Sequence, residues 1–346
     1  MGPLEWKTGT AFDLFVSLVV LHQPVVFGLR PNWAAGVRQR LPVPHREFLE
    51  KYYLFGGIPV PWLMELDQPL DASSVLKAIS DLEPPTRLAT LAFTVPVKEE
   101  VRETLEKISV RGSWHNNDVQ RLKSLLKNSP QTFTDAGLRS MVEMWSHARE
   151  SGELLLESLQ SYYKVFFEEE EARIRPVLAA GLSQARQLAR HLEPPALIEV
   201  LSHGVRFEPL DVDQRYCMIP SYWCSPLIVF SRLESGTLTL LFGVRPEVDS
   251  LEPGAVPPGA LVESLKSLAD PSRLRILRLL AGSPLTSSEL AKQLRLRLPT
   301  VIHHLRLLRL AGLVQITVSE TDKKYTTRLE SLEGMHSSLV KFIKSG

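Results

Sequence analysis

The sequence predicts an α+β fold: a mostly helical N-terminal body that includes a small, largely antiparallel sheet, followed by a separate C-terminal domain. Over residues 1–195, apolar residues recur at helical spacing, as at Phe12, Phe15 and Val19. Over residues 196–245, short runs rich in β-branched residues alternate with turn residues. Residues 246–260 are expected to be a linker, because this stretch is rich in proline and glycine and shows no periodicity. The C-terminal domain is then expected over residues 261–346.

The elements of the body follow from the same two periodicities. The segment AFDLFVSLVVL, which starts at Ala11, predicts an amphipathic first helix. A long helical segment is expected from about Leu138 to Ala180, with a break near Ser151–Gly152 and a kink at Pro176. Four strands are expected, or five with VRFEPL, in the runs ALIEVLSH, RYCMIPS, PLIVFS and TLTLLFGV.

The body carries no residue pattern that is specific for catalysis. Glu168–Glu171 is a run of four carboxylates, which fans around a helix at about 100° per residue and therefore indicates a solvated face. Cys217 and Cys224 lack the further nearby ligands that a zinc site needs, so they are interpreted as core residues. Motifs for nucleotide binding, serine hydrolysis or kinase chemistry do not occur. We expect no enzyme and no cofactor; the body could instead hold a ligand pocket or a protein interface.

Charge separates the chain into two parts. From Ala260 to Gly346 there are 14 Lys+Arg and 7 Asp+Glu, a balance of +7, and the remainder carries −6. This asymmetry predicts a basic domain with an anionic partner. Two cysteines in 346 residues do not suggest a disulfide framework, which favours a cytoplasmic location. Asp13 interrupts the N-terminal apolar segment and no cleavage pattern follows, so neither secretion nor membrane association is expected.

The C-terminal domain is expected to have the order helix, helix, helix–turn–helix, β-hairpin, helix. Asp270 is the predicted N-cap of the second helix. Thr286 and Glu289 form a capping-box pattern for the third helix, and Pro299 lies in the first turn of the fourth. LVQITV and KYTTRL predict the hairpin, and LESLEGMHSSLVKFIKSG predicts the last, amphipathic helix. In the second helix, the residues expected to face the core are Leu274, Ile276, Leu277 and Leu280.

This order is that of a winged helix–turn–helix, whose second helix enters the major groove of DNA while its hairpin lies along the backbone or minor groove. The pair His303–His304 is a poor metal site, because adjacent helical residues point about 100° apart. We expect His304 to be partly buried and His303 to be exposed. The candidate DNA contacts are Arg297, Thr300, Ile302, His303, Arg306, Arg309, Lys323 and Lys324.

The run LKSLADPSRLRILRLL…LTSSELAKQLRLRLPTVIHHLRLLRLAGLV closely resembles the arsenical-resistance repressor (ArsR) family of bacterial regulators. The resemblance covers about residues 261–329 and implies DNA binding, commonly repression, and dimerisation through the helix at 261–269 and the last helix. The family's metal sensors carry Cys-x-Cys where this chain has LTSSEL, or Asp and His pairs on the last helix, where this chain has only His336, with no partner histidine. The resemblance therefore implies no metal site. Ile302 and His303 replace the family's usual Ser followed by Arg, Gln or His, so the operator sequence can differ.

Together these observations predict a homodimeric repressor that binds a pseudo-palindromic, double-stranded DNA operator. The body is expected to bind a small-molecule effector or to add to the dimer interface. One alternative is an enzyme or small-molecule-binding body that the winged domain recruits to DNA. Another is a chromatin-type protein that binds DNA with little sequence preference.

Overall fold

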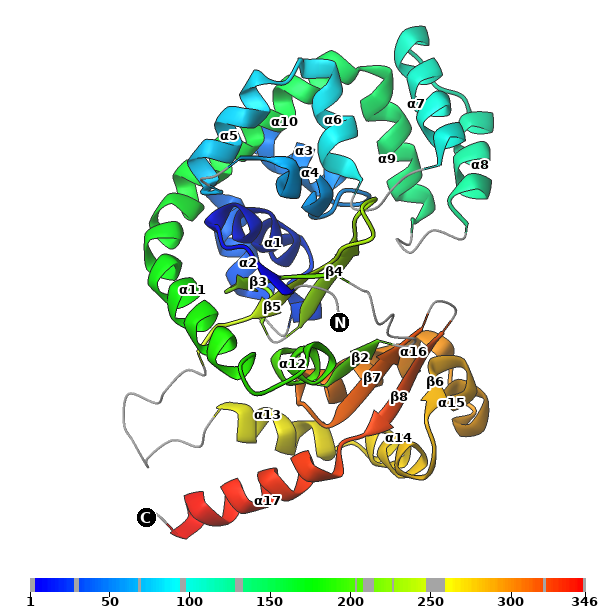
Figure 1. Ribbon diagram of the computed structural model, residues 1–346. Coiled ribbons are helices and arrows are strands. Elements are labelled where there is room, and N and C mark those ends of the chain that lie inside the picture. The colour runs from blue at the N-terminus through cyan, green and yellow to red at the C-terminus, as the bar shows by residue number, and fades with distance from the viewer. Residues whose placement is uncertain are drawn as a thin grey trace.

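The computed structural model describes residues 4–27, 31–67, 70–93, 98–127, 133–202, 204–207, 215–225, 227–246, 259–319 and 322–344. Most of the predicted linker, residues 246–260, lies outside these ranges. The N-terminal body forms the upper part of the molecule in Figure 1, and the C-terminal domain lies below it. The two sheets are both small and mixed, within a mostly helical chain, and this confirms the α+β class.

The first helix, α1 (Thr10–His22), is the centre of the body. All its residues except Val19 and His22 are buried, so the prediction of an amphipathic helix was wrong. Because other elements surround α1, no side of this helix faces solvent, and the helix therefore needs no polar side. The remaining helical elements of the body are η1 (Pro24–Phe27), α2 (Pro31–Gln39), α3 (Val43–Tyr52), α4 (Val60–Glu65), α5 (Ala72–Asp81), α6 (Pro84–Ala92), α7 (Glu99–Arg111), α8 (Asn116–Leu125), α9 (Asp135–Ser146), α10 (Ala148–Tyr162), the π-helical turn η2 (Tyr163–Phe167), α11 (Glu168–Leu188) and α12 (Pro194–Leu201).

The expected long helical segment is divided differently from the prediction. The break between α9 and α10 lies at His147, whereas Gly152 lies inside α10. A Cβ at Gly152 would collide with the backbone carbonyl of Pro84, so this glycine permits close packing of α10 on α6. Pro176 lies inside α11.

The body's sheet has the order β1-β3-β5-β4, formed by β1 (Leu4–Trp6), β3 (Tyr216–Ser221), β4 (Ile228–Arg232) and β5 (Leu238–Gly243). The expectation of a largely antiparallel sheet was wrong. β1 and β5 both pair with β3 in parallel, and only β4 and β5 pair antiparallel. The chain places β4 on the far side of β5, so that β3 and β5 meet directly and in the same direction.

Residues 196–203 were expected to form a strand, but most of them belong to α12. Pro194 and Pro195 occupy the first helical positions, where proline favours a helix start. Leu197 and Ile198 are buried on one side of the helix, so apolar residues that indicated a strand satisfy a short helix equally well.

The C-terminal domain has the predicted element order. It comprises α13 (Gly259–Leu268), α14 (Pro271–Gly282), β6 (Leu285–Thr286), α15 (Ser287–Leu294), α16 (Leu298–Leu310), β7 (Val314–Val318), β8 (Lys323–Thr327) and α17 (Leu329–Lys344). Ile276, Leu277 and Leu280 enter its core as expected. Leu274 does not, because its side chain is 50% exposed.

A strand of the body completes the sheet of the C-terminal domain. β2 (Val205–Phe207) comes from the predicted extra strand VRFEPL, but it pairs in parallel with β7 and does not join the body's sheet. The resulting order is β2-β7-β8-β6. Gly204 has φ +99°, which favours glycine, and its carbonyl accepts a 3.1 Å hydrogen bond from the Ile316 amide. The body and the C-terminal domain are therefore joined by backbone pairing as well as by the linker.

Candidate nucleic-acid interface

The helix–turn–helix consists of α15 and α16, which pack against each other. Thr286 and Glu289 form the predicted capping box: the Thr286 amide donates to Glu289 Oε2 at 2.7 Å, and the Glu289 amide donates to Thr286 Oγ1 at 3.2 Å. α15 ends at Leu294, and the next residue, its C-cap Arg295, has a left-handed φ of 54°. Pro299 lies in the first turn of α16, as predicted. These local signals fix where both helices begin and the sharp turn between them.

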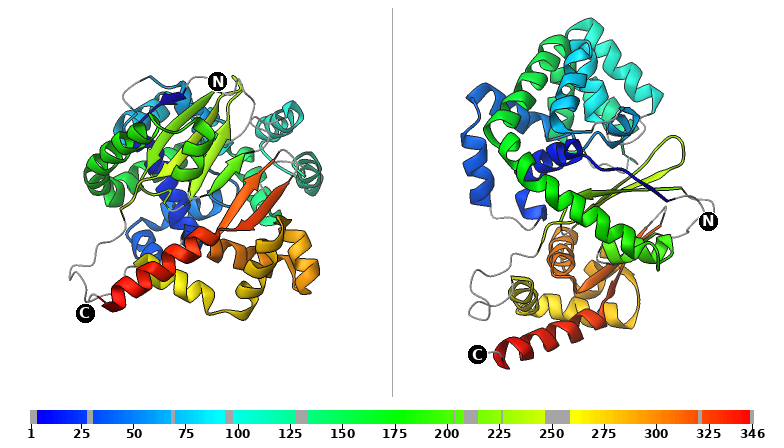
Figure 2. Two further views of the ribbon diagram at one scale, coloured as in Figure 1. Left: turned by 60° about the horizontal axis from the view of Figure 1, so that its bottom comes forward. Right: turned by 60° about the vertical axis from the view of Figure 1, so that its left-hand side comes forward.

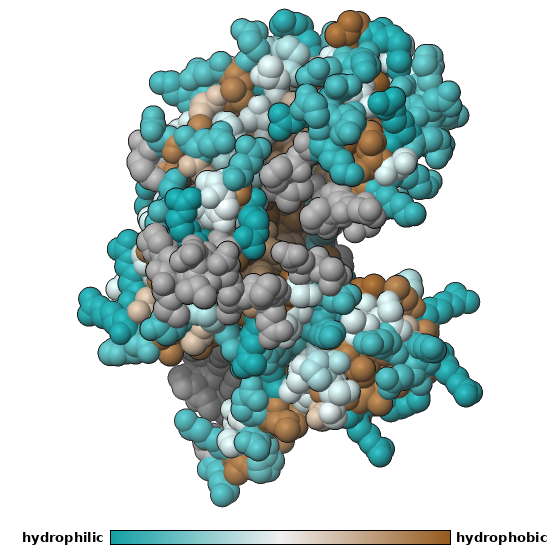
Figure 3. Space-filling model, turned by 45° about the vertical axis from the view of Figure 1, so that its right-hand side comes forward, coloured by the Kyte–Doolittle hydropathy of each residue, from teal (hydrophilic) through white to brown (hydrophobic). Residues whose placement is uncertain are grey.

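α16 has one buried side and one exposed N-terminal half. Val301, Leu305 and Leu308 are buried in the domain's core. On the other side Thr300 and Ile302 are exposed, Ile302 by 50%, as is Arg297 just before the helix. Apolar groups are visible on the surface of this domain in Figure 3. The half of the helix that would meet base edges is thus accessible to solvent.

The histidine pair divides as predicted. His303 is exposed, and its Nδ1 accepts a 3.0 Å hydrogen bond from Arg306 Nη2. Burial, followed by the charge of Arg306, lowers the pKa of His303 below its usual value. His304 is partly buried, and its ring centroid lies 6.1 Å from that of His303. His303 is therefore a polar surface group, oriented by Arg306.

Arg309 lies in a different environment from the other candidate contacts. Its pKa is lowered because burial withdraws water from the guanidinium, while Tyr325 of β8 and Cys224 of the body act in the opposite direction. The side chain of this residue is partly buried near the end of α16. Arg309 is therefore less accessible than the exposed residues at the start of the helix.

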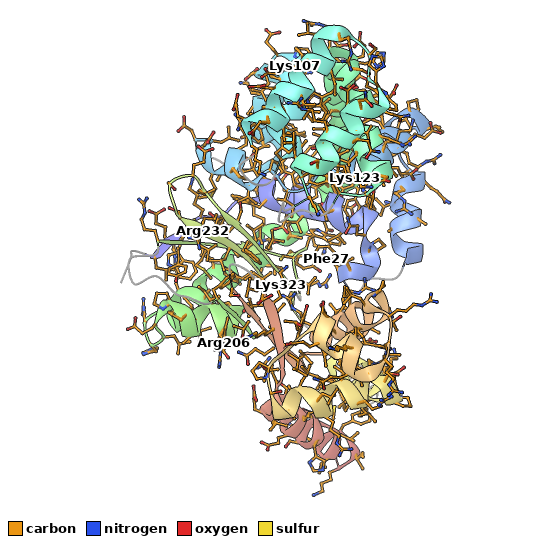
Figure 4. The ribbon with its side chains drawn as sticks, turned by 90° about the vertical axis from the view of Figure 1, so that its right-hand side faces the viewer. Phe27, Lys107, Lys123, Arg206, Arg232 and Lys323 are labelled. Atoms are coloured by element: carbon orange, nitrogen blue, oxygen red, sulfur yellow. The ribbon has the colours of Figure 1, made fainter. Side chains whose placement is uncertain are left out.

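The wing is the hairpin of β7 and β8, and Lys323 and Lys324 at the start of β8 are exposed. Lys324 lies opposite Thr317 on β7 and opposite Thr286 on β6, the short strand that leads into α15. This strand pairing fixes the position of the wing relative to the helix–turn–helix. Figure 4 shows Lys323 on the same side of the molecule as Arg206 and Arg232 of the body.

Residues 270–315 match the model of a family described as "Bacterial regulatory protein, arsR family". The C-terminal domain is an arsR-family domain. The match runs from the N-cap of α14 into β7, and so includes the whole helix–turn–helix. The arsR-family domain supports a function as a DNA-binding transcription regulator. No curated protein matches the chain.

Nothing in the described ranges brings three or more His, Cys, Asp or Glu side chains together in a way that could hold a metal ion. The absence of a metal site in the arsR-family domain stays a prediction. Cys217 and Cys224 are both buried, as interpreted from the sequence. Among the described helices, none is long and apolar enough to cross a membrane.

The sequence did not reveal the residues that connect the body to the arsR-family domain. Glu199 on α12 accepts hydrogen bonds from Arg206 on β2, at 2.6 and 2.7 Å, and from Gln315 on β7, at 3.3 Å. One carboxylate therefore contacts both of the strands that pair across the two parts. No local pattern marks Glu199, because its partners lie 7 and 116 residues away.

Proposed function

We propose that the chain is a dimeric, cytoplasmic repressor that binds a pseudo-palindromic operator, with the body acting as a regulatory module and not as an enzyme. The observation that carries this proposal is the exposed N-terminal half of α16 beside the exposed lysines of the wing. A helix with this exposure fits the major groove, and a basic hairpin beside it neutralises phosphates.

The candidate contacts divide into two groups by chemistry. Thr300 and His303 can hydrogen-bond base edges, and Ile302 can contact a thymine methyl group. Arg297, Arg306, Lys323 and Lys324 supply positive charge for phosphates, which fixes position without reading sequence. Arg309 belongs to the second group by its charge, but its side chain is partly buried.

Removing single contacts should separate these groups. His303→Ala or Thr300→Ala should weaken binding to a selected operator by about tenfold, and binding to random DNA much less, because base contacts carry the specificity. Arg306→Ala or Lys323→Ala should weaken both and reduce the slope of log affinity against log salt by about one, since each removes a phosphate contact. Fluorescence anisotropy at several salt concentrations measures both quantities. Arg149→Ala, an exposed cation on α10, is the matched control. Unchanged binding in all four variants would disprove the docking.

The proposed dimer interface lies on α13 and α17, which contact each other. None of the described residues of α17 is fully buried, and Leu265, Leu329 and Ile343 are exposed apolar residues on these two helices. A second copy that covers this surface would bury apolar area and place two copies of α16 against two half-sites.

Charged residues on this surface should separate the dimer. Leu265→Glu combined with Ile343→Glu should raise the dimer dissociation constant by at least about tenfold, because each places a carboxylate in the apolar contact. Sedimentation velocity of the full chain measures it. Val110→Glu, at a 90% exposed position on α7, should leave the dimer unchanged. A double variant as dimeric as the wild type would place the interface elsewhere.

A further inference from the structure

A groove of about 490 Å³ lies in the body, far along the chain from the helix–turn–helix. One wall is a continuous face of α11, from Arg175 to Arg190 just beyond the helix. The opposite wall is formed by Thr8–Thr10 at the start of α1 and by Leu70–Asp71 before α5. Figure 1 shows α11 passing beside α1 and α5.

The lining of the groove carries more positive than negative charge. Arg175, Arg186 and Arg190 face it, against the single carboxylate of Asp71. That carboxylate is already engaged as the N-cap of α5, since it accepts hydrogen bonds from the Ser74 amide at 2.7 Å and from Ser73 Oγ at 3.0 Å. Arg175 is also engaged, because it pairs with Glu171 at 3.3 Å, so the guanidinium groups of Arg186 and Arg190 are the surplus that favours an anion in the groove.

The base of the groove is apolar. Leu70 and Leu178 are each 2% exposed, and Leu182 is partly buried beside them. Arg186 also lies against an aromatic ring, with its guanidinium carbon 6.0 Å from the centroid of Trp6. A ligand that fits both features has an anionic head for the arginines and a short apolar body for the leucines.

Glu171 fixes the walls of the groove in place. Its buried carboxylate accepts hydrogen bonds from Thr10 Oγ1, from the Ala72 amide at 3.2 Å and from the Tyr163 hydroxyl at 3.1 Å. It also pairs with Arg175 at 3.3 Å. Glu171 thus links α1, α5, η2 and α11, and the interpretation of Glu168–Glu171 as a solvated run was wrong for this residue. A groove whose walls are held this way needs little rearrangement to bind.

We propose that this groove binds a small organic anion, a carboxylate or phosphate with a short apolar body, which serves as the effector. The role of this anion as an effector rests on the proposed function. The binding of the anion to the groove does not rest on it. α11 leads through α12 to β2, which pairs with the wing strand β7, and Figure 2 shows α11 extending towards the C-terminal domain. A ligand that shifts α11 can therefore act on the wing through the short stretch of chain from α11 to β2 and the strand pairing of β2 with β7.

Calorimetric titration of the full chain, without DNA, tests the groove directly. Octanoate and octyl phosphate are the anionic probes, 1-octanol is the uncharged probe, and inorganic phosphate has no apolar body. We expect at least one octyl anion to bind more tightly than both 1-octanol and inorganic phosphate, and Arg186→Gln combined with Arg190→Gln to weaken it by at least about tenfold. Arg149→Gln, an exposed arginine outside the groove, should bind like the wild type. Thermal unfolding checks that each variant is folded.

Two results would overturn the proposal: octyl anions that bind no more tightly than 1-octanol, or equal binding in the folded double variant. Operator affinity is then measured with and without the bound probe. A probe that binds the groove and leaves operator affinity unchanged removes the effector role only. A wild-type protein that binds the probe but binds no operator even without the probe contradicts the proposed function and leaves the groove standing.

Discussion

Replacing Val205 with aspartate should separate the wing strand β7 from the body. Val205 is 2% exposed and lies opposite Ile316 in the parallel pairing of β2 and β7, so the variant would bury a carboxylate without a partner. Such a charge costs about 3 kcal/mol or more, which exceeds what a three-residue strand pairing contributes. Amide hydrogen exchange at Ile316, whose N–H donates to the Gly204 carbonyl at 3.1 Å, should accelerate by at least about tenfold, since each 1.4 kcal/mol of lost protection is about a factor of ten. The β7 amides that point to β8 should change less, because that pairing stays in place.

The matched control is Val200→Asp, which introduces the same side chain at a 49% exposed position on α12. It should leave exchange in β7 unchanged. In the Val205 variant, exchange in α10 should also stay slow, because that helix packs on α3 and α6 far from the pairing. Faster exchange throughout the body would mean that the substitution unfolds it, and unchanged exchange at Ile316 would show that the pairing with β2 does not protect β7.

Replacing Asp13 with asparagine should change how stability depends on pH. Burial raises the pKa of Asp13 from 3.8 to about 6, against hydrogen bonds from the Trp223 amide at 2.8 Å, Ser221 Oγ at 2.7 Å and the Tyr222 amide at 3.2 Å that lower it. A raised carboxyl pKa means that the folded state binds the proton more tightly than the unfolded state. Stability from this group therefore increases as pH falls through 6 and levels off near 4.

The difference between the pKa of 3.8 and the raised pKa of about 6 corresponds to about 3 kcal/mol of free energy of unfolding. Relative to Asp13→Asn, the free energy of unfolding of the wild type should rise by about this amount between pH 7 and pH 4. Urea unfolding of both proteins at matched pH values measures the difference. Parallel curves would show that Asp13 does not titrate in this range.

The elements of the C-terminal domain could be predicted because short-range chemistry specifies them. Asp270 accepts from the Arg273 amide at 2.9 Å as an N-cap, Thr286 and Glu289 form their capping box, and Gly312 has φ +69° just past α16. Each signal acts within about four residues, so the sequence alone contains it. The exposure of His303 and the partial burial of His304 followed from the helical period in the same way.

The errors arose where partners are distant in the chain. The parallel pairings in the body's sheet depend on β1, a three-residue strand more than two hundred residues before β3, and on the place of β4 outside β5. The role of Glu171 depends on Thr10 and Ala72, which lie 161 and 99 residues away in the chain. None of these leaves a periodic pattern, because each is a property of the assembled fold.

β2 also determines where the protein can be divided. The proline-rich stretch before α13 suggests residue 259 as the start of an isolated C-terminal fragment. Such a fragment would lack β2, which lies earlier in the chain. β7 would then become an edge strand with open amide and carbonyl groups, the kind of surface that recruits strands from other molecules. We expect such a fragment to self-associate through β7 as its concentration rises, so its aggregation would reflect a missing neighbour and not an unstable domain.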